Sequence, residues 1–254
     1  MRSRLTIASV SAGLLAVLVI GFTAWGTVAQ RERQPLGMIT SLPIYWSGGD
    51  LSDMLDTAQN APDAVHWVRA ETQKRYDIIL LDNLAEADGL APNPRLAKLR
   101  YLLLAQPAAL PPADLVALDS WVRGGGRLLL FADPLLTEET GFGLGDRRRP
   151  QDMATISPLI NRLGLTETFD IAQSAQPSAV TFGNIVLPVH KYGLFTARND
   201  VRPCAITSGG VIAQCEVGRG RAIIVLDAHL LAREPQTAAK SRALRALMDA
   251  AFAD

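Results

Sequence analysis

The sequence predicts an α/β domain with a mostly parallel sheet flanked by helices, and three features carry that prediction. The continuous apolar runs Tyr101–Ala105 and Arg127–Ala132 have the character of buried strands. The helix predicted between them opens at Pro111 and ends at Gly124, and a crossover of about twenty residues requires parallel pairing. Short runs separated by glycine and asparagine over 180–217 predict an antiparallel addition in the C-terminal third.

The crossover helix has a recognisable start, face and end. Two prolines open it at positions where a missing N–H is harmless, and Asp114 lies in its first turn. Its apolar face is formed at helical spacing by Leu115, Leu118, Trp121 and Val122. The triple glycine 124–126 then supplies a left-handed C-cap.

The other elements follow in chain order from the same criteria. Strands are predicted at Leu36–Trp46, which includes the strand exit, and at Ala64–Arg69, Tyr76–Leu81, Thr166–Ile171 and Arg221–Leu226. Helices are predicted at Leu51–Ala58, Ile156–Leu163 and Ala238–Phe252, the last with Leu244, Leu247, Met248 and Ala251 inward. Residues 85–100 are predicted to be loop with a short helical turn, and 137–152 a surface loop. No linker divides residues 36–254, so we expect one domain there.

Residues 1–30 are predicted to be a membrane anchor, joined to the domain by a linker over 31–35. Arg2 and Arg4 precede an uncharged run, Leu5–Ala29, that would cover about 37 Å as a helix and so cross a bilayer. Thr27–Ala29 also resembles a signal-peptide cleavage site, so cleavage after Ala29 stays open, although the length of the run favours a retained anchor. The basic residues place the N-terminus in the cytoplasm and the main domain outside.

The charge balance excludes one class of partner. Lys plus Arg equals Asp plus Glu at 25 each, so the composition gives no indication of nucleic-acid binding.

The only cysteines, Cys204 and Cys215, fall in one predicted hairpin. Gly209 and Gly210 suit a two-residue turn, and that register sets the two cysteines opposite each other. A disulfide in an oxidising compartment and a pair of reduced core cysteines are both compatible with this pattern.

Three predicted strands end in an acid: Asp82, Asp133 and Asp227. Ligands of open α/β sheets bind at the carboxyl ends of strands, so one interpretation is that these three acids converge there and, with His229, form a divalent-metal site or a site for phosphate-ester chemistry. The simpler interpretation is that aspartate is favoured where a strand exits into a turn. No further carboxylate or histidine pair at ligand spacing supports a resident metal. His66 is expected in a strand and His190 in a loop.

Three short motifs carry a resemblance to a known family: Leu42–Trp46, Leu104–Asp133 with its closing Asp-Pro, and Gly218–Asp227. They resemble membrane-anchored bacterial proteins, the auxiliary components of uncharacterised or gliding-motility-type ABC transport systems. That family's fold is similar to class I glutamine amidotransferases, which implies an amidotransferase-like or flavodoxin-like sheet. Amidotransferases place a nucleophilic cysteine in the turn that corresponds to Ala105–Pro107, where this chain has none. The resemblance therefore implies the scaffold without the catalysis.

The resemblance implies a non-catalytic accessory or scaffold domain of an ABC-type transport complex, with permease and ATPase subunits as partners. It also implies a single-pass protein of a bacterial inner membrane that contacts lipid through Leu5–Ala29, with a periplasmic or extracytoplasmic domain and no cofactor. One alternative is a metal-dependent hydrolase at the acidic strand ends. Another is an envelope ligand-binding module that stacks ligands on Trp46 and Trp67, although such aromatics more often belong to a core.

Overall fold

The computed structural model describes residues 33–45, 65–86, 89, 91–137, 140, 142–143, 145–146, 149–198, 204–233 and 236–253. The chain divides into residues 1–33 and a compact unit of residues 34–254, and the second is described below. The predicted span Leu5–Ala29 and the predicted helix Leu51–Ala58 lie outside the described residues. Within the described part of the chain, no helix is long and apolar enough to cross a membrane.

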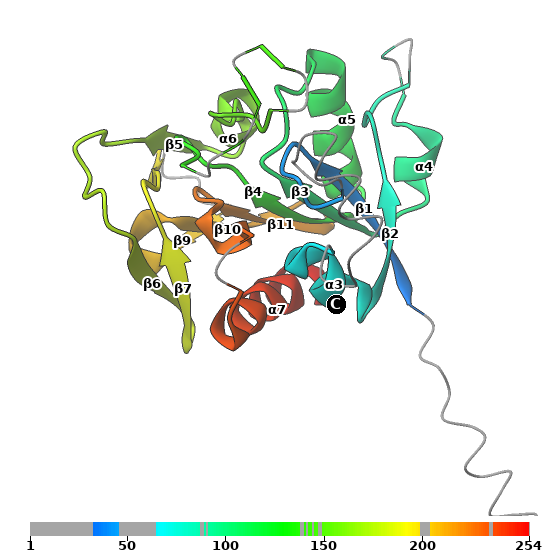
Figure 1. Ribbon diagram of the computed structural model, residues 1–254. Coiled ribbons are helices and arrows are strands. Elements are labelled where there is room, and N and C mark those ends of the chain that lie inside the picture. The colour runs from blue at the N-terminus through cyan, green and yellow to red at the C-terminus, as the bar shows by residue number, and fades with distance from the viewer. Residues whose placement is uncertain are drawn as a thin grey trace, which may run out of the picture. The chain divides into compact units, whose positions relative to one another are not determined.

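A central sheet of seven strands, in the order β2-β1-β3-β4-β11-β10-β9, organises the domain (Figure 1). The strands are β1 Gln34–Thr40, β2 Tyr76–Leu80, β3 Tyr101–Ala105, β4 Arg127–Phe131, β9 Cys204–Thr207, β10 Ile212–Val217 and β11 Gly220–Val225. The first five in the order pair in parallel, whereas β10 and β9 are antiparallel. The predicted mixed α/β architecture with a mostly parallel sheet is therefore confirmed. β1 begins at Gln34, inside the predicted linker, because Gln34 already pairs with Tyr76.

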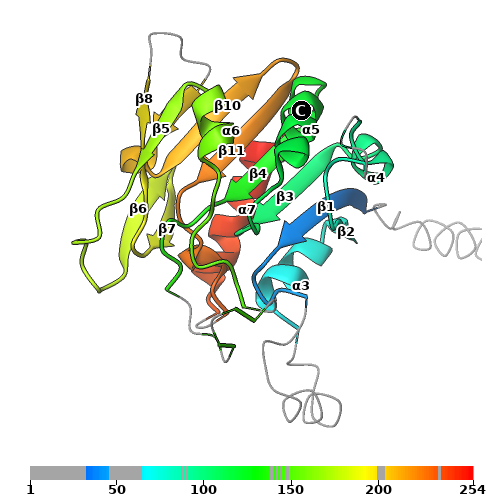
Figure 2. The same cartoon turned by 90° about the horizontal axis from the view of Figure 1, so that it is seen from above.

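Helices cover both faces of the sheet, and each face has its own hydrophobic core (Figure 2). One core joins the sheet to α3 Trp67–Gln73 and α7 Ala238–Phe252. The other joins it to α4 Pro94–Ala97, α5 Pro112–Arg123 and α6 Ser157–Arg162. In β3, Leu103 faces the first core and Leu102 the second, so a continuous apolar run is required, as for any parallel strand covered on both sides. The four predicted inward residues of α7 are all buried.

The predicted strand Ala64–Arg69 is wrong, because Trp67–Gln73 is helix α3. His66 is the N-cap of this helix, and its Nδ1 accepts a hydrogen bond from the backbone N–H of Val68 at 3.2 Å. The buried residues Trp67, Val68, Glu71 and Thr72 recur at helical spacing. The first six residues alone alternate in character, and the helical period becomes visible only when residues 70–73 are included.

Two small antiparallel sheets flank the C-terminal half. One pairs β5 Leu165–Thr168 with β8 Leu194–Ala197, and the other is the hairpin of β6 Ser178–Phe182 and β7 Ile185–Val189. Two 3-10 turns, Ser208–Gly210 and His229–Leu231, complete the described elements. The antiparallel character predicted for residues 180–217 is thus confirmed.

The triple glycine after α5 has one residue in the left-handed conformation and another in close contact with an aromatic ring. Gly124 is still right-handed, and the left-handed conformation predicted for the triple glycine falls on Gly125, with φ of 120°. A Cβ on Gly126 would lie 2.4 Å from the ring of Trp121, so the indole packs directly on the bare backbone. This close approach lets α5 lie tightly against the start of β4.

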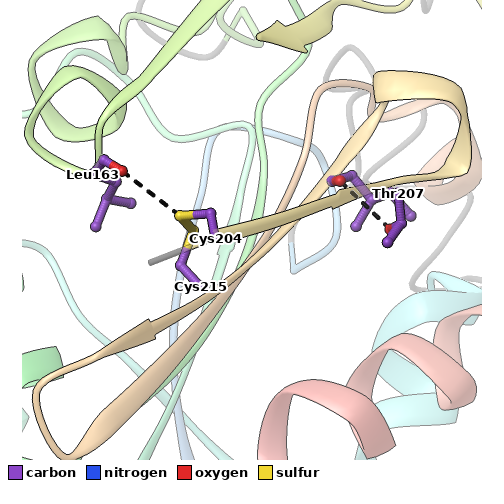
Figure 3. Close-up of a disulfide and its surroundings, with 5 residues drawn as sticks. Leu163, Cys204, Thr207 and Cys215 are labelled. Carbon is purple, nitrogen blue, oxygen red and sulfur yellow. Dashed lines mark hydrogen bonds between the residues drawn. A yellow bond between two sulfur atoms is a disulfide. The ribbon is translucent and has the colours of Figure 1, made fainter. Parts of the chain in front are cut away.

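The β9–β10 hairpin holds the two cysteines (Figure 3). Cys204 pairs in register with Cys215, as the position of the glycine pair predicts, and a disulfide joins them with an S–S distance of 2.01 Å. The connection is longer than a two-residue turn, because Thr207 pairs with Ile212 and Ser208–Gly210 forms a 3-10 turn between them. Both cysteines are buried, and Cys204 Sγ lies 3.7 Å from the carbonyl oxygen of Leu163.

Candidate functional site at the carboxyl edge of the sheet

Two of the three strand-end acids lie side by side. β4 and β11 are neighbours, and the pairing of Phe131 with Val225 sets Asp133 level with Asp227, two residues further along each strand. Neighbouring strands are about 4.8 Å apart. Each aspartate is only 1% exposed.

Asp82 does not join this pair, which corrects the alternative interpretation in which all three acids converge. It follows β2, which is separated from β4 by β1 and β3, a lateral distance of about 14 Å. Asp82 is also exposed, whereas Asp133 and Asp227 are buried. The three strands end in the same residue type, but two of these aspartates are buried and the third is exposed.

Every carboxylate oxygen of Asp133 and Asp227 accepts a backbone hydrogen bond. The donors to Asp133 are the N–H groups of Leu135 at 2.8 Å and Ala228 at 3.1 Å. The donors to Asp227 are the N–H groups of His190 at 2.7 Å and His229 at 2.8 Å. The two acids therefore tie together the loops that leave β4, β7 and β11, which is the turn-forming role that aspartate has at strand exits.

Burial makes both acids hold their protons more strongly than in water. The pKa of Asp133 is raised to about 6, chiefly by desolvation and against the opposing effect of the Leu135 and Ala228 N–H groups. The pKa of Asp227 is raised well above its usual value, first by burial and then by the negative charge of Asp133. Two adjacent buried carboxyls do not readily ionise together, because each negative charge opposes the other.

Two histidines stand beside the acids, and sequence reasoning missed one of them. The rings of His190 and His229 meet edge to face with centroids 5.5 Å apart. The Nδ1 of His190 lies 2.8 Å from Thr137 Oγ1, and its Nε2 lies 3.0 Å from the Ala175 carbonyl. Burial lowers the pKa of His229, with Lys240 and His190 adding to the effect. No local pattern marks His190, because only the packing of β7 beside the 3-10 turn His229–Leu231 brings it here.

Gln106 occupies the turn after β3 and closes the centre of this edge. It is fully buried and has a positive φ of 48°. Its Oε1 accepts from the Asp133 N–H at 2.7 Å, and its Nε2 donates to the carbonyls of Asp133 at 3.1 Å and Gln151 at 2.8 Å. Its own carbonyl accepts from Ser41 Oγ, and Ser41 Oγ accepts from the Gln151 N–H at 2.9 Å. One side chain thus links β3, β4 and the segment around residue 151.

We call the Gln106 side chain, with its hydrogen bonds to Asp133 and Gln151, the latch. Its position in the sheet bears on whether this edge can bind a ligand. In the order β2-β1-β3-β4-β11, the chain direction across the sheet reverses between β1 and β3, and ligands of open α/β sheets bind at such a switch point. Ser41 follows β1 and Gln106 follows β3, so both stand at this point. Hydrogen bonds join the two residues to each other and to the Gln151 backbone. The arrangement is suited to holding loops in place, and it leaves the acid oxygens engaged by the chain itself.

The remaining predicted site residues have structural surroundings. Among the described residues, no group of three or more His, Cys, Asp or Glu side chains is placed to hold a metal ion. Trp67 is buried and its Nε1 donates to the Ala232 carbonyl at 2.9 Å, so it does not form a stacking platform on the surface. Trp46 lies outside the described residues. His66 caps α3, and burial together with Arg233 and Lys240 lowers its pKa to about 4.

Comparison with known proteins identifies a fold and no family. No family model matches the chain, and no curated protein matches it. The N-terminal domain of mmIFT52 is similar, with 9% identity, a TM-score of 0.51, and coverage of 87% of this chain and 98% of that domain.

Two further solved structures are similar at lower scores. The exo-β-1,4-mannosidase Op5Man5 from Opitutaceae bacterium strain TAV5 has 14% identity and a TM-score of 0.45 over 94% of this chain. This chain spans only 38% of the mannosidase. A ThuA-like protein from Bacteroides uniformis ATCC 8492 has 9% identity and a TM-score of 0.45, over 87% of this chain and 89% of that protein. At 9% identity, the likeness to the mmIFT52 domain shows a shared fold alone.

Proposed function

We propose that residues 34–254 form a non-catalytic accessory or scaffold domain of an ABC-type transport complex, tethered to the outer face of a bacterial inner membrane by Leu5–Ala29. The observation that carries the proposal is Gln106. In the turn where a related scaffold would present a nucleophile, this chain has an amide whose side chain is engaged in three hydrogen bonds within the domain. An engaged amide stabilises the edge and is a poor nucleophile.

The scaffold itself we assign to the amidotransferase-like or flavodoxin-like type. Numbered along the chain, the five parallel strands β1, β2, β3, β4 and β11 have the order 2-1-3-4-5, which is the doubly wound order of flavodoxin-like sheets. The positive φ of Gln106 directly after β3 supports the amidotransferase-like comparison, because a strained turn after a central strand is the feature such a scaffold uses to present a side chain. A fold of this kind serves many functions, so the site residues decide.

A hydrolase acting through Asp133 and Asp227 is the second candidate, and the raised pKa of Asp133 favours it, since a general acid needs a proton near neutral pH. The candidate also requires a substrate to reach carboxyls that are 1% exposed and bonded to backbone N–H groups. It predicts a melting shift with divalent cations that Asp133→Asn and Asp227→Asn abolish. The absence of a shift with Mg²⁺, Mn²⁺, Ca²⁺ and Zn²⁺ would remove the metal-dependent form of this candidate.

Gentle-detergent affinity purification of the full-length chain from its native membrane, followed by mass spectrometry, tests the accessory role. We expect an ATPase and a multi-span permease in stoichiometric amounts. The matched control is residues 1–33 fused to an unrelated soluble domain, which reveals proteins retained by the anchor alone. A full-length chain that purifies without partners would contradict the proposal, and so would partners that the control retains equally.

A further inference from the structure

Basic residues gather at the edge of the sheet opposite the acids, where the parallel strands begin. Arginines lie at or within one residue of the start of four of the five parallel strands: Arg75 before β2, Arg100 before β3, Arg127 at the first position of β4, and Arg219 and Arg221 around the first residue of β11. We name this set the arginine edge.

The strand register places these arginines close to one level. Gln34 pairs with Tyr76, Leu36 with Tyr101, and Arg127 with both Tyr101 and Arg221. The positions therefore differ by at most three residues along the strands, about 10 Å, and five neighbouring strands spread them over about 19 Å. In Figure 2 the starts of β1 and β3 and the β10–β11 turn lie along the right-hand side of the sheet.

The charges that surround the arginine edge leave it positive. Three further cations lie on it: Lys74, Lys98 and Arg123. Four acids pair with these cations, namely Asp249 with Arg75, Glu216 with Arg221, Asp119 with Arg123 and Glu71 with Lys74, and a fifth acid, Asp77, is the second residue of β2. Within the described part of residues 34–254, the eight cations of this edge therefore outnumber these five acids. Glu71 and Asp119 are buried, and each also pairs with a second cation, Arg245 and Arg162 respectively.

An open hollow of about 570 Å³ lies on the same edge, beside the start of β3 and the end of α5. Its lining includes the exposed side chains of Arg100 and Arg219, with Trp121 and the Gly124–Gly126 backbone between them. Arg219 also donates to the Gly124 carbonyl at 3.0 Å, which holds its guanidinium at the rim. Guanidinium groups bind phosphate oxygens through paired N–H donors, so the hollow suits a phosphate group.

We propose that the arginine edge docks on anionic phospholipid headgroups and so orients the domain on the bilayer. The inference rests on the membrane tether of the proposed function. The predicted span ends at Ala29, and the five residue steps from there to Gln34 can extend over at most about 18 Å. Because β1 starts on the arginine edge, this short connection brings the cationic side of the sheet, rather than the acidic one, within reach of the headgroups. Attraction of this kind acts within about 8 Å at physiological salt.

Hydrogen exchange of the full-length chain in lipid nanodiscs tests the docking. Discs of pure phosphatidylcholine are compared with discs that contain one-third phosphatidylglycerol. We expect exchange in the segments 98–101 and 217–221 to slow by roughly tenfold on the anionic discs. The difference should disappear in 0.5 M NaCl, where the screening length falls to about 4 Å.

Two charge reversals with the same change in net charge form the matched pair. Arg219→Glu acts on the arginine edge and should reduce the protection to roughly threefold. Arg242→Glu acts on an exposed residue in the second turn of α7, towards the opposite edge, and should leave the protection unchanged. Equal exchange on both lipids, or equal effects of the two variants, would overturn the docking while leaving the tether intact. A chain that fails to incorporate into discs would overturn the tether and the docking together.

These discs contain no transport subunits. The result in discs therefore does not depend on whether an ATPase and a permease bind the protein. Failure of the lipid docking can thus be distinguished from failure of the proposed transport role.

Discussion

Replacement of Gln106 by alanine tests whether this side chain is the latch of the carboxyl edge. The substitution removes three hydrogen bonds of 2.7, 2.8 and 3.1 Å in a fully buried position. Each such bond contributes about 1 kcal/mol net, so the free energy of unfolding should fall by about 3 kcal/mol. The positive φ of 48° is retained by alanine, so the cost of that conformation cancels in the comparison.

The assay is urea unfolding of the 31–254 fragment, which contains both hydrophobic cores, followed by tryptophan fluorescence. The slope of the transition should stay constant, so that a change in midpoint reports stability. Gln176→Ala, on an exposed glutamine, is the surface control and should change stability by less than about 0.5 kcal/mol.

Gln106→Glu gives an isosteric second variant. Its carboxylate can still accept from the Asp133 N–H, but it must be protonated to donate to the Asp133 or Gln151 carbonyl. We therefore expect this variant to be weakened at pH 7.5 and partly restored at pH 4.5, relative to wild type. A loss below about 1 kcal/mol for Gln106→Ala, or no pH dependence for Gln106→Glu, would refute the latch.

The remaining predictions concern a histidine, a glycine and the disulfide. The pKa of His66 is lowered to about 4, chiefly by burial, so the folded state loses stability as pH falls from about 6.5 towards 4. The variant His66→Asn keeps an N-cap residue but does not titrate in this range. The difference in free energy of unfolding between the variant and wild type should therefore shift by about 2–3 kcal/mol in favour of the variant between pH 7.5 and pH 4.5. Plots of stability against pH that run parallel for the two proteins would contradict the assignment. The raised pKa of Asp133 acts in the opposite direction, but it is common to both proteins and cancels. Gly220→Ala would place a Cβ 2.0 Å from the Val122 carbonyl oxygen and should lower the free energy of unfolding by about 3 kcal/mol or more. As the control, Gly143→Ala places a Cβ with nothing within 4 Å and should leave stability unchanged. Equal stabilities of the two variants in urea unfolding would be inconsistent with this packing. Replacing both Cys204 and Cys215 by serine opens a loop with a sequence separation of 11 and should lower the free energy of unfolding by about 3 kcal/mol. The measurement is urea unfolding under non-reducing conditions. An unchanged midpoint would show that the disulfide does not constrain the unfolded chain.

The parallel unit from β3 through α5 to β4 could be predicted because its signals are local. The apolar runs, the prolines before α5 and the glycines after it all act within a few residues of one another. The hairpin register could be predicted for the same reason, since the glycine pair aligns Cys204 with Cys215. Helix α3 was mistaken for a strand because six alternating residues fit both periods, and the cap formed by His66 is a contact that the pattern does not reveal.

The candidate site shows where sequence reasoning stops. The acids Asp133 and Asp227 were recognised as strand ends, and so was Asp82, but only the order of the strands separates the buried pair from the exposed residue. The sequence shows that the turn containing Gln106 has no nucleophile. It does not show the hydrogen bonds of Gln106 to Asp133 and Gln151, because these residues lie 27 and 45 positions away along the chain. His190 was assigned correctly to a loop, but its place beside His229 depends on packing across 39 residues of chain.

By itself, the sequence determined the class of this domain, the positions of most strands and helices, and the alignment of its cysteines, because periodicity, caps and turns depend on neighbouring residues. The tertiary structure alone decided which strand ends meet, which acid is buried, and that the arginines at the strand starts form one edge. Those outcomes depend on strand order and register. They are set by the burial of two hydrophobic cores across the whole chain, and residue spacing along the chain does not encode them.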